Sequence, residues 1–163
     1  MPFAIRRLIE ADAPAYRALR LASLETDPAS FGADPVAEAA LPLSAFVERI
    51  AQQAVFGAFA GAELVGMAAF RQETGAKERH KAVVRGVYVH RDWRGQGVAS
   101  ALFTTLIDEA RAVVERLTLV VVQGNESAIA VYRRHGFSIY GVEPMARKHE
   151  GQYIDKVLMG RGL

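Results

Sequence analysis

The fold is decided by one stretch, Arg91-Asp92-Trp93-Arg94-Gly95-Gln96-Gly97-Val98-Ala99, which joins a predicted strand to a predicted helix. The strand covers about residues 80–90, and the helix covers about residues 97–114, where apolar side chains recur at helical spacing. Residues 117–122 form a nearly all-apolar, β-branched run, which is typical of a strand covered on both faces. A strand, a helix and a second strand in this order predict two parallel strands.

The rest of the chain adds elements on both sides of this unit. They are a strand at 3–8, helices at 12–26 and 43–53, a hairpin of strands at 55–60 and 64–71, a helix at 125–135, and strands at 137–145 and 153–159. The order βααβββαβαββ predicts an α/β fold of the α+β type, with about four helices on a mixed sheet of about seven strands. We expect a single domain over residues 1–163. Residues 26–42, with three prolines, form either a binding loop or a connection.

Composition excludes several classes of protein. The chain has 163 residues, of which 51% are hydrophobic and 23% charged, as in a soluble globular domain. No apolar run approaches the roughly 20 residues of a membrane helix and no secretory signal is visible, so we expect a cytoplasmic protein that binds no membrane. A net charge of +2 argues against a nucleic-acid partner. The lack of Cys excludes disulfides, thiolate metal sites and cysteine nucleophiles.

The turn that contains Gly95 and Gly97 has the features of an anion site. Without a Cβ these residues let a phosphate approach the backbone, and the first N–H groups of a helix have no partner within it. Arg94 adds a guanidinium suited to a diphosphate. Taken alone, such glycines are explained equally well as turn residues. A P-loop is excluded because the chain lacks Gly-Lys-Ser/Thr, and a Rossmann motif is excluded because Ser100 stands where a third glycine is needed. The four His residues lack the spacing of zinc ligands, so we expect no metal site.

A second motif follows the strand at 117–122 and reads Asn125-x-x-Ala128-x-x-x-Tyr132-x-x-x-Gly136-Phe137. Together with Arg94-x-x-Gly97-x-Ala99, it resembles the GNAT superfamily of acetyl-CoA-dependent N-acetyltransferases. The order of elements is similar over nearly the whole chain, whereas the specific motifs lie between about Val83 and Phe137. The resemblance implies a sheet that is splayed between its fourth and fifth strands.

The resemblance also implies where acetyl-CoA, the acetyl donor, would bind. Its pantetheine arm would run along the strand that holds Val87 and Val89, beside the second motif with Asn125 and Ala128. Gly86, in mid-strand, is consistent with a bulge whose N–H steadies the thioester oxyanion, and equally with a simple irregularity. Asn125 would bond the arm, cap its helix, or do both. The diphosphate would lie on the backbone amides of Arg94, Gly95, Gln96, Gly97, Val98 and Ala99.

Tyr132 is the general acid that the resemblance implies. A phenol with a pKa of about 10 stays protonated at neutral pH and can protonate a leaving thiolate, whose pKa lies near 8.5. The alternative is an aromatic side chain that only packs its helix on the sheet. We expect direct attack by the amine, because an acyl-enzyme through Cys is excluded.

The general base is left open. Some members of the superfamily carry a Glu on the strand equivalent to residues 83–90, and this chain has none there. The candidates are Glu25, Glu38, Glu143, His90 or an ordered water.

The acceptor would be a primary amine. By resemblance, residues 24–38 form a flap that walls the acceptor site, together with a turn over residues 143–152. Glu25 and Glu38 flank Phe31 in the flap and would present negative charge to a cationic acceptor, although each is also explained as a helix-end or surface acid. No motif identifies the amine or distinguishes a monomer from a homodimer. The alternative function is a catalytically inactive CoA-binding regulatory module, against which Tyr132 and both intact motifs argue.

Overall fold

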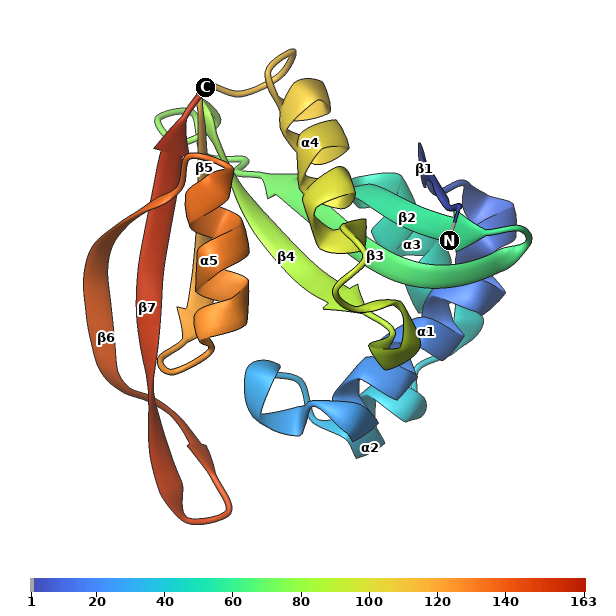
Figure 1. Ribbon diagram of the computed structural model, residues 1–163, viewed down its shortest axis with the longest axis horizontal. Coiled ribbons are helices and arrows are strands. Elements are labelled where there is room, and N and C mark those ends of the chain that lie inside the picture. Colours follow the sequence, from blue (N-terminus) through green and yellow to red (C-terminus); the bar gives the residue numbers. More distant parts are fainter. Residues whose placement is uncertain (1) are drawn as a thin grey trace.

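The computed structural model describes residues 2–163, and within them seven strands form one mixed sheet in the order β1-β2-β3-β4-β5-β7-β6 (Figure 1). Among these strands, β4 and β5 run parallel and all other neighbours run antiparallel. The parallel pair is the one that the sequence predicts. The strands are β1 (Ala4–Arg7), β2 (Ala54–Ala60), β3 (Glu63–Gln72), β4 (Lys81–Val89), β5 (Arg116–Val122), β6 (Ser138–His149) and β7 (Gln152–Gly162).

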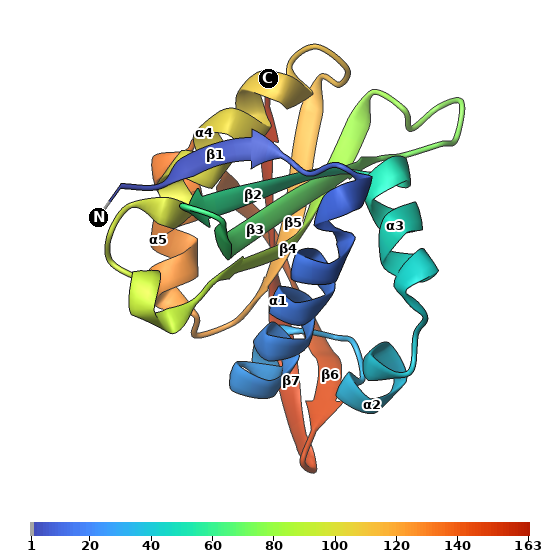
Figure 2. The ribbon, with the colours of Figure 1, turned by 90° about the vertical axis from the view of Figure 1, so that its right-hand side faces the viewer.

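Helices cover both faces of the sheet. One face carries α4 (Val98–Ala110) and α5 (Glu126–Arg134), and the other carries α1 (Ala13–Thr26) and α3 (Leu43–Gln52) (Figure 2). Shorter elements connect them: η1 (Glu10–Asp12), η2 (Pro28–Ser30), α2 (Pro35–Ala39) and η3 (Arg91–Trp93). No helix within residues 2–163 combines the length and apolar character needed to cross a membrane.

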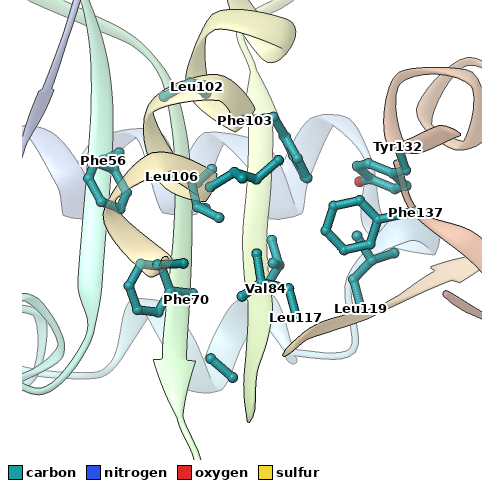
Figure 3. Packing of buried hydrophobic residues seen from close by; sticks show 14 of the residues in the cluster. Phe56, Phe70, Val84, Leu102, Phe103, Leu106, Leu117, Leu119, Tyr132 and Phe137 are labelled. Atoms are coloured by element: carbon teal, nitrogen blue, oxygen red, sulfur yellow. The ribbon is translucent and has the colours of Figure 1, made fainter. Parts of the chain in front are cut away.

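Alternating side chains of the strands supply a core on each face. On β2, Phe56 and Ala58 belong to the core beneath α4 and α5, whereas Val55 and Phe59 belong to the core beneath α1 and α3. This is the period of two that a strand covered on both faces requires. Phe103 of α4 is fully buried at the centre of the first core (Figure 3).

The strand β4 changes face at Gly86. Val84 packs on the α4 side and Tyr88 on the α1 side, although a regular strand would place both on one face. The register explains the change, because Gly86 and Val87 both lie opposite Ala68 of β3. Gly86 has a φ of +61°, which glycine adopts without strain. Of the two interpretations that the sequence left open, the structure has the bulge, and it turns Tyr88 toward α1.

The parallel strands β4 and β5 separate soon after they meet. Only residues 81–83 of β4 pair with residues 116–118 of β5. Beyond Val83, β4 remains bonded to β3 and β5 remains bonded to β7, so each strand keeps one paired edge. Their facing edges diverge, which confirms the predicted splay between the fourth and fifth strands.

The hairpin of β6 and β7 is longer than the sequence predicts. His149 pairs with Gln152, so the connection is a two-residue turn at Glu150-Gly151, with φ of +49° and +76°. The prediction of a turn over residues 143–152 is therefore wrong. The last residues of β6 are polar, and a polar run predicts a loop. They form a strand nevertheless, because this edge strand faces solvent, where polar side chains are tolerated.

Two further elements differ from the sequence-based prediction. The short helix α2 is absent from the prediction, and it forms because Asp34 accepts a hydrogen bond from the Val36 N–H at 3.2 Å and Pro35 takes the first helical position. The helix α4 ends at Ala110 rather than near residue 114.

The buried ring of Phe103 sets a prediction for stability. It lies 5.1 Å from the ring of Tyr132 and 5.9 Å from that of Phe137. We expect Phe103→Ala to lower the free energy of unfolding by about 3–5 kcal/mol, because it leaves a cavity between α4 and α5. Chemical denaturation measures this, with Val113→Ala as the control because Val113 is exposed. Equal losses in the two variants would contradict the assignment of this core.

Candidate active site

A cleft of about 1140 Å³ occupies the gap where β4 and β5 diverge. Its walls come from both faces of the sheet: Val98 and Tyr132 belong to the α4 and α5 side, and Arg20 and Phe31 to the α1 side. The cleft thus passes through the sheet. Of the predicted residues, those that line it are Phe31, Val87, Val89, Arg94, Gly95, Gly97, Val98, Ala99, Asn125, Ala128 and Tyr132.

The turn before α4 presents free backbone donors to the cleft. Gly95 and Gly97 have φ of +72° and +83°, and a Cβ added at either would meet no atom within 4 Å. The open space therefore lies where a side chain would otherwise stand. No backbone N–H from Gly95 to Ser100 donates a hydrogen bond to another described residue. Together with the positive end of the α4 dipole, these donors suit a phosphate group.

Arg94 and Gln96, both in this turn, point differently. The Arg94 Nε donates to the Val89 carbonyl oxygen at 3.0 Å, and its guanidinium lies 5.6 Å from the centre of the Tyr88 ring. This fixes Arg94 on the wall of the cleft. The Gln96 side chain instead donates to the Asp92 carbonyl oxygen at 3.1 Å and does not line the cleft. Gln96 can therefore donate its backbone N–H to a ligand in this turn, whereas its side chain is already bonded to Asp92.

Asn125 begins α5. Its Oδ1 accepts hydrogen bonds from the Ala128 N–H at 3.3 Å and from the Ser127 hydroxyl at 3.2 Å, as an N-cap does. Its side chain also lines the cleft, so capping leaves it in reach of a ligand.

Tyr132 lies in the last turns of α5, against Phe103 and Phe137. Its side chain is buried, yet it lines the cleft. Burial raises the pKa of Tyr132 to about 12. The phenol therefore keeps its proton throughout the physiological pH range, which a proton donor needs.

The flap, residues 24–38, forms the α1 side of the cleft. Phe31 packs edge-on against Tyr88 with ring centres 6.4 Å apart, and the Tyr88 hydroxyl lies 2.9 Å from the Thr26 hydroxyl. Glu25 is exposed and outside the lining. Glu38 is buried behind the cleft, where it forms ion pairs with Arg20 and Arg49. The flap therefore contributes an aromatic wall rather than the acidic pair expected at Glu25 and Glu38.

The other candidate bases also lie outside the cleft lining. Glu143 is exposed on β6, and the His90 Nδ1 accepts from the Asp92 N–H at 3.2 Å in the turn after β4. Asp27, in the flap, is the one carboxylate among the described residues that line the cleft. Sequence reasoning passed over it because an Asp before a proline is sufficiently explained as a turn residue.

The cleft is strongly basic within residues 2–163. Besides Asp27, its charged lining residues are Arg20, Arg85, Arg94, Arg134, Arg147 and Lys156. Burial, together with the nearby Arg71, lowers the pKa of Arg85. Of these residues, Arg94 alone belongs to the predicted site, because the others come from five separate elements and no spacing connects them. Such a lining concentrates positive charge and therefore suits anionic groups such as phosphates and carboxylates.

Comparison with known proteins supports a common origin. Residues 11–137 match the model of the acetyltransferase (GNAT) family. This chain belongs to that family. The L-amino acid N-acetyltransferase AaaT of Escherichia coli is 36% identical over 78 residues, which are 47% of this chain and 48% of that protein. The chain spans about half the length of the curated relatives it matches.

Solved structures of this family share the fold. A GNAT-family acetyltransferase from Streptococcus pneumoniae superposes with a TM-score of 0.88 at 24% identity, covering 99% of this chain and 100% of that one. A ribosomal-protein-alanine N-acetyltransferase from Brucella melitensis gives a TM-score of 0.82 at 27% identity, covering 98% and 99%. The predicted GNAT family and its fold are thereby confirmed.

The buried ion pairs of Glu38 predict a pH dependence of stability. Burial opposes ionisation of Glu38, but Arg49 and Arg20 outweigh it and lower its pKa below the ordinary 4.5. A lowered pKa stabilises the folded state above the unfolded-state pKa, and this contribution is lost as the pH falls below about 4.5. We expect Glu38→Gln to lower the free energy of unfolding at pH 7 by about 1–3 kcal/mol and to flatten its acid dependence.

Denaturant titrations between pH 3 and pH 7 measure both effects. Glu48→Gln, which removes an exposed carboxylate on α3, is the matched control. Parallel pH profiles for wild type and Glu38→Gln would show that the ion pairs do not stabilise the flap.

Proposed function

We propose that this chain is an acetyl-CoA-dependent N-acetyltransferase that acetylates the α-amine of an amino-acid-type acceptor. The observation that carries the proposal is the cleft through the sheet, which has free amides and Gly97 at one wall, Tyr132 within it and an aromatic flap on the opposite side. A donor and an acceptor that enter from opposite faces would meet between β4 and β5. The family supports the donor, and the E. coli relative, named for L-amino acids, supports the acceptor.

Acetyl-CoA would lie with its diphosphate on the amides of residues 95–99 and its arm along β4. The bulge at Gly86 supports this path, because it turns Val87 and Val89 toward the α4 side while the facing edge of β4 lacks a strand partner. A pantetheine amide can then replace the missing β5 backbone groups. Arg94 and Arg134 supply positive charge to the lining for the phosphates.

The reaction forms a C–N bond between the acceptor amine and the acetyl carbonyl carbon, and breaks the C–S bond of the thioester. The amine loses one proton and the departing thiolate gains one. Tyr132 donates the proton that the thiolate gains, and solvent then returns a proton to the phenolate while Asp27 releases the proton taken from the amine. The Tyr132 pKa of about 12 exceeds the ordinary thiol value of about 8.5, so the phenol holds its proton until negative charge develops on the departing sulfur.

Asp27 is placed to receive the proton of the amine, since it is the carboxylate that the described lining offers. The α-amine of a peptide N-terminus has a pKa of about 7.7–8.0, but the adjacent carboxylate of a free amino acid stabilises the ammonium and raises the pKa of its α-amine above that range. A free amino acid therefore needs a group that accepts the proton, although it needs less assistance than a lysine-like amine with a pKa of about 10.4.

The first test of this mechanism is Tyr132→Phe, which removes only the hydroxyl. We expect kcat to fall by roughly 10²-fold or more while the Kd of acetyl-CoA changes by no more than a few-fold. Thiol release in the presence of an amino-acid pool measures turnover, and calorimetry measures the Kd. Tyr140→Phe is the control because Tyr140 is exposed on β6. An unchanged kcat would reduce Tyr132 to a packing residue.

The second test places a carboxylate in the phosphate seat. Because Gly97 faces open space in the cleft, we expect Gly97→Glu to weaken acetyl-CoA binding by at least about tenfold, or 1.4 kcal/mol. Gly61→Glu is the matched control, since Gly61 also has a positive φ and open surroundings but lies in the β2–β3 turn. Equal affinity in both folded variants would refute the seat. Tight binding of acetyl-CoA without thiol release by any amine would instead favour the regulatory module.

A further inference from the structure

Arg147 of β6 carries a polar group that nothing in the described chain satisfies. Its Nη1 is buried and has no hydrogen-bond partner among residues 2–163. A buried donor without an acceptor has lost its hydrogen bonds to water and gained none in return, which destabilises the folded protein. Arg147 lines the cleft and lies against the flap, where its guanidinium nitrogen Nη2 is 3.3 Å from the position of a Cβ at Gly32. Arg147 therefore lines the acceptor side of the cleft and carries a donor that no residue among 2–163 satisfies.

A bulge in β6 holds Arg147 in this position. Glu143 pairs with Lys156 and Arg147 with Ile154, so three residues of β6 lie opposite Asp155 alone. Met145, in the bulge, has a φ of +51°, which is unfavourable for a residue with a side chain. The Asp155 carboxylate accepts a hydrogen bond from the Met145 N–H at 2.8 Å and so stabilises the strained backbone. Strain maintained by a specific contact is typical of a segment that aims a functional side chain.

The surroundings of Arg147 are cationic and aromatic. Arg20 lies with its guanidinium 5.2 Å from the centre of the Phe31 ring, and its charge is partly neutralised by Glu38 at 3.3 Å. Arg85, which also lines the cleft, is close enough to Arg20 for its pKa to be lowered further. The carboxylate that pairs with Arg20 is thus behind the cleft, and no acid of the described chain pairs with Arg147.

We propose that Arg147 is the receptor for the carboxylate of the acceptor, and that it makes the enzyme specific for free amino acids over amines that lack an α-carboxylate. This inference rests on the proposed function. A guanidinium presents its N–H groups in a fork that matches a carboxylate, and Arg147 lines the cleft with no hydrogen-bond partner for its Nη1 among residues 2–163. The flap aromatics would pack on the rest of the acceptor, and its α-amine would point toward the gap between β4 and β5.

Two other ligands differ from a free amino acid in the anionic group that they would bring to Arg147. A peptide N-terminus, such as the ribosomal-protein alanine named for the Brucella melitensis protein, has an α-amine but no adjacent carboxylate. A phosphate of CoA is the other available anion. In Figures 1 and 2, however, the β6–β7 hairpin and the turn before α4 lie apart, which favours separate anions at the two places. The experiment separates these three ligands.

The test compares each standard L-amino acid with its carboxamide, and rates are expressed per neutral amine because the carboxamide lacks the carboxylate and therefore has a less basic α-amine. Initial rates of thiol release from acetyl-CoA are measured for wild type, Arg147→Gln and Arg147→Lys. We expect wild type to prefer the acids, and Arg147→Gln to lose at least about tenfold in kcat/KM toward them, mainly through KM. Toward the carboxamides, Arg147→Gln should stay within about threefold of wild type. Arg147→Lys should fall between, because it keeps the charge but loses the fork.

Two controls keep the outcome specific. Arg79→Gln removes an equal charge from the exposed loop before β4 and should behave as wild type. The Kd of acetyl-CoA should be unchanged in Arg147→Gln, and a weakened Kd would assign Arg147 to a CoA phosphate instead. A wild-type preference for carboxamides, or equal losses on acids and carboxamides, would overturn the proposal while leaving acetyl transfer intact. Absence of thiol release with every amine would refute the proposed function itself.

Discussion

The short parallel contact between β4 and β5 is the constraint on which the rest of the structure depends. The two strands pair through residues 81–83 and 116–118 and then diverge, while β3 and β7 hold their outer edges. Backbone groups in a protein interior need partners, so a gap of this kind is stable only where water or a ligand can supply them. The sheet therefore supports a core on each face and still leaves a gap between β4 and β5 through which the cleft passes.

The bulge at Gly86 determines which side chains of β4 face each side of the sheet. Before it, Val84 packs under α4 and Arg85 points away from that core; after it, Val87 and Val89 pack on the α4 side and Tyr88 meets the flap. One inserted residue thus gives a single strand an apolar track on one face and a polar and aromatic surface on the other. A second bulge, in β6, places Arg147 in the lining of the cleft on the side of the β6–β7 hairpin. Both irregularities lie on strands that border the cleft.

The sequence reveals the half of the cleft that is local in the chain. Helical periodicity, an apolar strand and two glycines specify α4, β5 and the turn between them, and the spacing from Asn125 to Tyr132 specifies α5. The other half, which we propose receives the acceptor, is assembled from the flap, β4 and the last hairpin, which lie far apart in sequence. Glu38 looked available because no pattern reveals that Arg20 and Arg49 enclose it. Arg147 looked like a loop residue because its strand is an exposed, bulged edge.

Amide chemical shifts test most directly whether acetyl-CoA binds in the gap between β4 and β5, as proposed. In a titration of the ¹⁵N-labelled protein with acetyl-CoA, the largest changes should fall on Gly86 to Val89, on Gly95 to Ser100 and on the start of α5, with α3 and the exposed edge of β6 little affected. Saturable binding whose largest changes lie outside these three segments, with β4 unperturbed, would contradict the claim.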